Sequence, residues 1–277
     1  ADFNGDGKLD VAVVNKSATS ISVLLGNGNG TLMTKVDYAT GSTPTAIATG
    51  DLSGDGKPEI VVANRGSHNI SMFVNNGDGT FMPKRDFPLA SSSTPTSIAV
   101  ADVTNNGQLD VVVGYQAYAS VAVLSGNGNG TFQPIQTSSV SLQSKAIALG
   151  DVNGDGKLDI AYAALSGNQV GVAFGSGTGT FTTPTLYIGG QSPQDVAIKD
   201  IDGDGKLDLA VAAQSGNAIG VLLNLGTGTF APKLDFGAGV FPSGVAIADF
   251  DNDGRSDIAA ANEGSDTVSV LHHACVP

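Results

Sequence analysis

Six copies of one acidic segment are the part of this sequence whose residue types and spacing could do chemistry. The first copy reads Asp-Phe-Asn-Gly-Asp-Gly-Lys-Leu-Asp, with oxygen-bearing side chains at positions 1, 3, 5 and 9 and Gly at position 6. Side chains spaced in this way around a tight turn can surround a hard cation, and the carbonyl of position 7 can join them. Oxygen donors without His or Cys favour Ca²⁺ over Mg²⁺ or Mn²⁺. We therefore predict up to six calcium sites.

The predicted ligands are positions 1, 3, 5, 7 and 9 of each copy, position 7 through its backbone carbonyl. They are Asp2, Asn4, Asp6, Lys8, Asp10, Asp51, Ser53, Asp55, Lys57, Glu59, Asp102, Thr104, Asn106, Gln108, Asp110, Asp151, Asn153, Asp155, Lys157, Asp159, Asp200, Asp202, Asp204, Lys206, Asp208, Asp249, Asp251, Asp253, Arg255 and Asp257. The third copy keeps only two anionic side chains, so we expect its site to be the weakest. A plain Asx turn favours the same residues one at a time, but six copies with four fixed positions argue against that reading.

The acidic segments recur at a nearly constant spacing, which indicates the elements that position them. Successive copies start 49, 51, 49, 49 and 49 residues apart, and a Gly-x-Gly-Thr marker keeps the same step. Each repeat reads as four short strands: apolar runs such as 45–50 before the acidic loop, 9–14 and 21–25 after it, and a polar run beginning at Phe81, Phe132, Phe181 or Phe230. The repeats begin near Asp2, Asp51, Asp102, Asp151, Asp200 and Asp249.

Four antiparallel strands in 40 to 50 residues is the size of a propeller blade. We therefore predict an all-β fold: one β-propeller domain over residues 1–277 with about six four-stranded blades. A parallel β-helix uses much shorter units and fits poorly. The first repeat lacks the strand before its loop and the last lacks its hairpin and fourth strand, which leaves 22 of 24 strands. These incomplete blades could be completed by another chain, giving a homo-oligomer or filament by strand addition.

The motif Asp-x-Asn/Asp-x-Asp-Gly-x-x-Asp, repeated with Phe-containing Gly-rich hairpins, resembles the FG-GAP/VCBS repeats of integrin-α-type β-propellers. The resemblance spans essentially the whole chain. It implies a calcium-binding loop between the first two strands of each blade and an extracellular or cell-surface location. Members of that family often close with seven blades, so an alternative is a seven-bladed ring with a missing or partner-supplied part. The family includes adhesion receptors, lectins and polysaccharide lyases, so the fold alone does not fix the function.

Composition agrees with metal loops and argues against other partners. The net charge is −13, and 19 of the 26 acidic residues lie in the six loops. Lys and Arg number 13 and form no run, so we expect no nucleic-acid partner. No apolar stretch approaches the roughly 20 residues of a membrane-spanning helix. The one cysteine, Cys275, has no partner within the chain for a disulfide.

Few other residues suggest chemistry. The glycine hairpins lack the Gly-Lys-Ser/Thr ending of phosphate loops. His68 lies in a polar turn, and His272 and His273 are adjacent on the expected last strand and should point to opposite faces, which makes them a poor joint metal site. We predict no catalytic residue. Tyr115 and Tyr118 lie in an irregular turn of the third repeat and are the best candidates for a ligand surface, although packing on their own blade is the reading we favour.

These observations predict a non-enzymatic, extracellular, calcium-stabilised propeller that acts as an adhesion, binding or structural module. Its partner would be a protein or glycan at the cell surface. The alternatives are a carbohydrate-binding lectin or lyase-associated propeller, and a self-assembling surface subunit. A polysaccharide lyase is the remaining enzymatic alternative.

Overall fold

The computed structural model describes residues 1–164 and 166–273, and Cys275 lies outside this part of the chain. The described residues form 22 β-strands and one short 3-10 turn, η1 (Gln214–Gly216). The chain divides into two compact units, residues 1–137 and 138–277, which are described separately. The all-β prediction is confirmed, and the number of strands is the one expected from the repeats.

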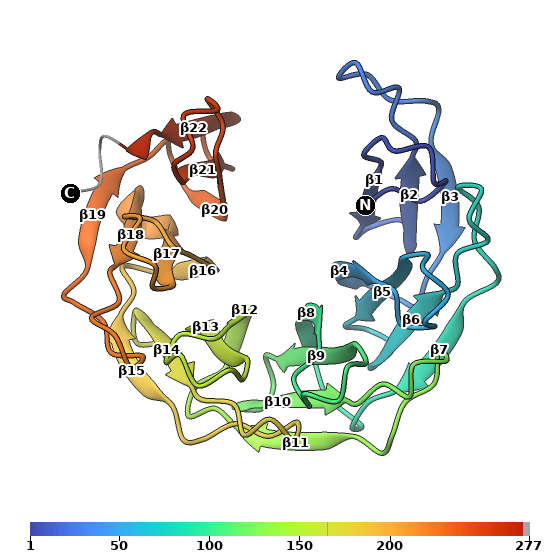
Figure 1. Ribbon diagram of the computed structural model, residues 1–277, viewed down its shortest axis with the longest axis horizontal. Helices are drawn as coiled ribbons and strands as arrows, with labels where there is room; N and C mark the ends of the chain where they lie inside the picture. Colours follow the sequence, from blue (N-terminus) through green and yellow to red (C-terminus); the bar gives the residue numbers. More distant parts are fainter. Residues whose placement is uncertain (165, 274–277) are drawn as a thin grey trace. The chain divides into compact units, whose positions relative to one another are not determined.

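The first unit carries three sheets, coloured from blue to green in Figure 1. Its strands are β1 (Val11–Asn15), β2 (Ser20–Leu24), β3 (Val36–Ala39), β4 (Pro44–Gly50), β5 (Glu59–Asn64), β6 (Asn69–Phe73), β7 (Arg85–Pro88), β8 (Pro95–Ala101), β9 (Asp110–Tyr115), β10 (Ser120–Leu124) and β11 (Gln136–Ser139), with the unit boundary falling in β11. The sheets are β1-β2-β3, β4-β5-β6-β7 and β8-β9-β10-β11, each a meander of sequential strands.

The second unit repeats this plan (Figure 1). Its strands are β12 (Ser144–Gly150), β13 (Asp159–Ala164), β14 (Gln169–Ala173), β15 (Thr185–Ile188), β16 (Pro193–Lys199), β17 (Asp208–Ala213), β18 (Ala218–Leu222), β19 (Leu234–Gly237), β20 (Pro242–Ala248), β21 (Asp257–Asn262) and β22 (Thr267–Leu271). They form the sheets β12-β13-β14-β15, β16-β17-β18-β19 and β20-β21-β22. As expected, the first and last sheets of the chain have three strands and the other four have four.

The second strand of each four-stranded sheet is buried along its whole length, as β5, β9, β13 and β17 show. Burial on both faces explains why these strands read as almost continuous apolar runs. Within each unit the first strands of neighbouring sheets pack together, β4 on β8 and β12 on β16. This packing gives each unit its core and leaves the acidic loops at the ends of the first strands.

The fourth strands begin later than the sequence predicted. Phe81, Phe132, Phe181 and Phe230 each form an isolated bridge, and the regular strand starts four residues further on. A proline follows each of these phenylalanines by two or three residues, as Pro83 does in the second repeat. Proline has no N–H to donate to the sheet, so the ladder is interrupted between the bridge and the strand.

Candidate metal-binding loops

Each complete acidic loop connects the first and second strands of its sheet, for example β16 to β17 for residues 200–207. The carboxylate at position 1 organises the turn. In the fifth loop Asp200 Oδ1 accepts a hydrogen bond from Gly203 N at 2.7 Å, and Oδ2 accepts one from Gly205 N at 2.9 Å. The position 5 side chain caps the next turn, since Asp204 Oδ1 accepts from Lys206 N at 2.9 Å. The loop therefore presents its remaining oxygen lone pairs from a fixed backbone.

Two positions of the loop need a left-handed backbone. At position 6, Gly205 has φ of +85°, and the same glycine is present in all six copies. At position 4, Gly203 has φ of +81°, while Asn105 and Asn252 occupy this position at +53° and +61°. Glycine and asparagine tolerate this region far better than other residues, which explains the alternation of Gly and Asn at position 4.

The last carboxylate of the loop is buried and acts as a clamp. Asp208 is 1% exposed; its Oδ2 accepts from Ile201 N at 2.9 Å and its Oδ1 from Asn224 N at 2.7 Å. It therefore joins the start of its own loop to Asn224, two residues beyond the end of β18. The same pair of bonds is made by Asp10, Asp110, Asp159 and Asp257.

The second loop differs because its last acid is longer. Glu59 Oε2 accepts from Leu52 N at 2.8 Å and from Ser53 N at 2.9 Å, and Oε1 accepts from the Ser53 hydroxyl at 3.1 Å. Both carboxylate oxygens are thus used inside the loop. Burial raises the pKa of Glu59, and it does the same for Asp159 and Asp208.

Neighbouring sheets of one unit are also tied together through the loops, at the carbonyl of position 2. In the first unit Gly79 N donates to Phe3 O at 3.2 Å, and the Phe3 and Phe81 rings pack edge to face at 5.4 Å. In the second unit Asn224 Nδ2 donates to Val152 O at 2.8 Å, and His273 Nδ1 donates to Ile201 O at 3.0 Å. His273 therefore replaces the asparagine found one repeat earlier and has a structural role.

Carboxylates converge most closely in the fifth and sixth loops. Oxygens of Asp200, Asp202 and Asp208 lie within 4.8 Å of one another. In the sixth loop Asp249, Asp251 and Asp253 form a second such group. Sets of three carboxylates on a tight turn fit the donor preference of Ca²⁺, although Lys206 already pairs with Asp204 in the fifth loop. The other four copies carry Asn, Ser or Thr at position 3 and contribute fewer anions.

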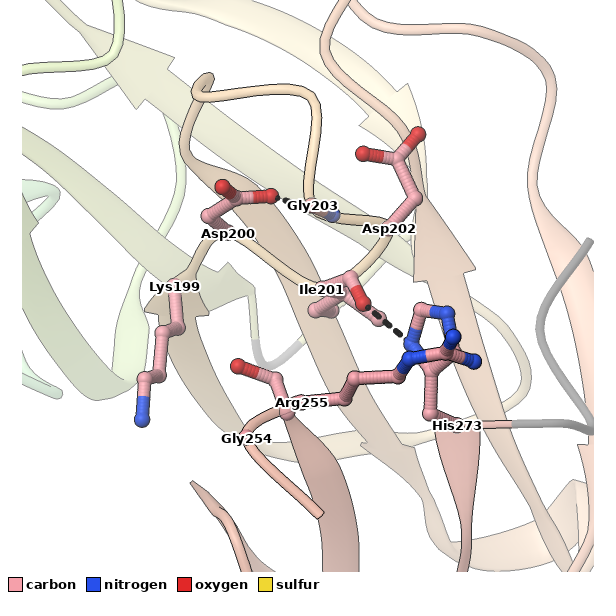
Figure 2. Close-up of a pocket in the computed structure, with 9 residues that line it drawn as sticks. Lys199, Asp200, Ile201, Asp202, Gly203, Gly254, Arg255 and His273 are labelled. Atoms are coloured by element: carbon pink, nitrogen blue, oxygen red, sulfur yellow. Dashed lines mark hydrogen bonds between the residues drawn. The ribbon is translucent and has the colours of Figure 1, made fainter.

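A pocket of about 540 Å³ opens beside the fifth loop, between it and the sixth (Figure 2). Lys199 and Arg255 reach it from opposite sides, and Asp200 and Asp202 lie along its other edge. Arg255 and His273 both line the pocket, and in Figure 2 the His273 ring is bonded to the Ile201 carbonyl. The pocket is therefore lined by positively and negatively charged side chains, next to the carboxylate group of the fifth loop.

The imidazole of His272 joins the acids of the sixth loop, which the sequence reading did not anticipate. Its Nδ1 lies 3.2 Å from Asp251 Oδ2 and 3.5 Å from Asp257 Oδ1. His272 and His273 lie beyond β22, which ends at Leu271, so the expectation that they belong to the last strand is wrong; they nevertheless contact different neighbours. Comparison of the repeats could have drawn attention to His272, because it is a polar residue at a position where the preceding repeat has the apolar Leu223.

The two tyrosines proposed as a ligand surface are separated by the structure. Tyr115 is the last residue of β9, not a turn residue; it is 1% exposed, and burial raises its pKa to about 12. Tyr118 lies in the turn as expected and is 46% exposed. Tyr118 is thus the one of the pair that can meet a ligand.

Meanders of four antiparallel strands, repeated with one loop geometry, define a β-propeller. A model of the FG-GAP-like repeat matches residues 2–62, 51–113, 110–162, 151–211 and 200–260. The chain belongs to this family.

Solved structures show the same fold. An Agrocybe aegerita lectin, described as recognising non-reducing terminal N-acetylglucosamine, is 22% identical with a TM-score of 0.63, over 99% of this chain and 79% of the lectin. A streptogramin B lyase is 16% identical with a TM-score of 0.63, over 97% and 80% of the two chains. The V. cholerae biofilm matrix protein Bap1 is 22% identical with a TM-score of 0.53, over 90% of this chain and 40% of Bap1. A lectin, a biofilm matrix protein and a lyase thus share this fold.

No curated protein sequence matched the chain. Among the described residues, no helix is long and apolar enough to cross a membrane.

Proposed function

We propose that this propeller is an extracellular binding or structural module whose blades are stabilised by Ca²⁺ in the acidic loops. The observation that carries the proposal is the convergence of three carboxylates in the fifth loop, where Asp200, Asp202 and Asp208 meet at the start of the buried strand β17. A calcium ion held there would neutralise repulsion between the acids and fasten the loop to the second strand. Adhesion or matrix association is the role we favour, with a protein or glycan partner at the cell surface.

Calcium removal tests the stabilising role. Protein stripped with EDTA should melt at a lower temperature than protein returned to millimolar Ca²⁺, because the ion binds only the folded loops. One site at 100 times its Kd adds about 2.7 kcal/mol to the free energy of unfolding. Adding Mg²⁺ to the stripped protein should raise the melting temperature less than Ca²⁺ does, because Mg²⁺ demands a tighter octahedral coordination shell. Equal melting temperatures with EDTA and with Ca²⁺ would contradict the proposal.

A pair of variants assigns the effect to a loop. Asp202→Asn removes one of three converging charges and should reduce the calcium-dependent rise in melting temperature. Asp235→Asn is the matched control, because Asp235 is an exposed residue of β19 paired with Lys233. The same reduction in both variants would argue against a site in the fifth loop.

Glycan binding is the second candidate, and it is favoured by the likeness to the Agrocybe aegerita lectin and by the exposed ring of Tyr118. Sugar rings stack on exposed aromatic side chains of this kind. A glycan array that includes N-acetylglucosamine-terminated glycans would test it, with Tyr118→Ala as the variant expected to lose binding. Binding that survives in Tyr118→Ala would remove this residue from the site.

A further inference from the structure

A nitrogen donor, His272, lies just after β22 and beside the acids of the sixth loop, at a position where the other repeats have Leu, Val, Ser or Phe. His272 occupies the position held by Leu223 one repeat earlier and by Leu25 in the first repeat. Its Nδ1 and one oxygen each of Asp251 and Asp257 lie within 4.8 Å of one another. Among the described residues, the other groups of this kind contain carboxylates alone.

The spacing of the three atoms suits a small metal ion. Zn²⁺ binds nitrogen and carboxylate oxygen at about 2.0–2.2 Å, so two ligands of a tetrahedral site lie about 3.3 Å apart. His272 Nδ1 lies 3.2 Å from Asp251 Oδ2 and 3.5 Å from Asp257 Oδ1. A direct charge-assisted hydrogen bond would be shorter, at about 2.7–2.9 Å.

Asp257 is held in place before any ion arrives. It is completely buried, and its Oδ2 accepts from Phe250 N at 3.0 Å while its Oδ1 accepts from His273 N at 2.9 Å. A carboxylate oxygen has two lone pairs, so Oδ1 keeps one for a metal. Hydrogen bonds to a ligand from the surrounding residues fix its orientation and raise metal affinity.

The other two donors are reachable from solvent. The His272 side chain is 54% exposed and that of Asp251 is 42% exposed. An ion could therefore enter, and a water molecule or an outside ligand could complete its shell.

We propose that Asp251, Asp257 and His272 form a site for a transition-metal ion with borderline ligand preference, Zn²⁺ in the first place. Imidazole suits Zn²⁺, Co²⁺ and Ni²⁺, whereas Ca²⁺ prefers oxygen alone. The proposal is independent of calcium in the other loops. In the sixth loop the two ions compete, because Asp251 also belongs to the all-carboxylate group with Asp249 and Asp253.

Zn²⁺ titration by calorimetry tests the site on metal-free full-length protein in calcium-free buffer. Wild type should bind Zn²⁺, and His272→Leu, which installs the residue of the first and fifth repeats, should bind it about tenfold more weakly or not at all. His68→Leu is the matched control, since His68 contacts the Ser93 carbonyl and no acid of a loop. Zn²⁺ binding of equal affinity in wild type and His272→Leu, or no Zn²⁺ binding by wild type, would overturn the proposal.

Co²⁺ gives a spectroscopic reading of the same site. A nitrogen-containing four-coordinate site should show visible d–d absorption in wild type that His272→Leu lacks. Circular dichroism of each variant confirms that the fold is kept. The calcium-dependent melting shift of His272→Leu reports the proposed stabilising function separately, so failure of one proposal is distinguishable from failure of the other.

A gain-of-site variant completes the test. Leu223→His places an imidazole at the equivalent position of the fifth loop, where Asp202 and Asp208 are already close together. The Zn²⁺ stoichiometry should rise from one to two. A folded variant that still binds a single ion would contradict the assignment of this position as the source of the ligand.

Discussion

Asp208 and Asn224 lie sixteen residues apart, and Asp208 Oδ1 accepts a 2.7 Å hydrogen bond from the backbone N–H of Asn224. The other oxygen of Asp208 accepts from Ile201 N at 2.9 Å. One buried carboxylate thus joins the acidic loop to the end of the third strand of its sheet. The same relationship recurs in five of the six loops, so the last acid of the motif is a structural element whether or not a metal is bound.

Removing this clamp should cost stability in the absence of metal. Asp208→Ala leaves two buried N–H groups without an acceptor, and we expect the free energy of unfolding to fall by about 3 kcal/mol. Asp208→Asn keeps one acceptor oxygen and should lose less. Denaturant unfolding in EDTA measures both, because metal then contributes nothing.

The control for the clamp is Asp235→Ala, which removes an exposed acid and a surface ion pair with Lys233. Such a change should alter the free energy of unfolding by no more than about 0.5 kcal/mol. A similar value for Asp208→Ala would show that the buried bonds contribute little.

The clamp also shows what the sequence could and could not predict. The repeat spacing predicted the strands and the loops, because periodicity is a direct consequence of a repeated fold. The assignment of Asp208 to a metal shell stays a prediction, and the structure adds backbone partners that the sequence did not indicate, because a metal ligand and a buried acceptor are the same residue type. Which partners a carboxylate meets depends on the strand that returns sixteen residues later, and a local pattern does not contain that information.

Two other residues, Tyr115 and His272, also have partners in the structure that the local sequence did not indicate. Tyr115 reads as part of an irregular turn, yet it extends β9 into the core, because Pro95 of the neighbouring strand pairs with it. The expectation that His272 and His273 diverge argued only against a metal site made by the two histidines together, and the acids of the sixth loop were not considered as partners. The two histidines do diverge, but the divergence brings His272 to Asp251.

A matched pair of substitutions at position 4 tests the left-handed turn. Gly203 has φ of +81° and open space where a side chain would begin, so any cost of substitution comes from the backbone alone. Gly203→Ala should lower the free energy of unfolding by about 1 kcal/mol, while Gly203→Asn, the residue type of Asn252, should cost less. Thermal melts of the two variants give the comparison. Equal melting temperatures for Gly203→Ala and Gly203→Asn would argue that the left-handed backbone angle is not the cause of the destabilisation.

A second glycine is required by packing and not by backbone angle. A Cβ on Gly171 of β14 would lie 2.2 Å from the ring of Tyr162, which is buried and donates its hydroxyl to Val140 O at 2.8 Å. Gly171→Ala should therefore destabilise the protein by about 1–3 kcal/mol. Gly237→Ala is the control, since Gly237 also lies in a strand and has nothing within 4 Å. Urea unfolding should separate the two, and equal effects would show that Tyr162 moves aside without cost.

The pH dependence of stability should contain a contribution from Asp195, an acid of β16 outside the loops. Its Oδ2 accepts from Val245 N at 3.0 Å and its Oδ1 from Val196 N at 2.9 Å, and burial is the largest effect and raises its pKa. A raised pKa means that the folded state holds the proton more tightly than the unfolded chain does. The resulting stabilisation is complete below the unfolded pKa of 3.8 and is lost as pH rises through the folded pKa.

Asp195→Asn removes this titration while keeping an acceptor for Val245 N. The difference in free energy of unfolding between Asp195→Asn and wild type should therefore grow in favour of the variant as pH rises from 3.8 through the folded pKa. Above the folded pKa this difference in free energy of unfolding should stay constant. Denaturant unfolding in EDTA at a series of pH values measures the difference, and Asp235→Asn provides the comparison for an exposed acid. A difference between Asp195→Asn and wild type that does not change with pH would show that the buried hydrogen bonds to the carboxylate fully offset its loss of hydration.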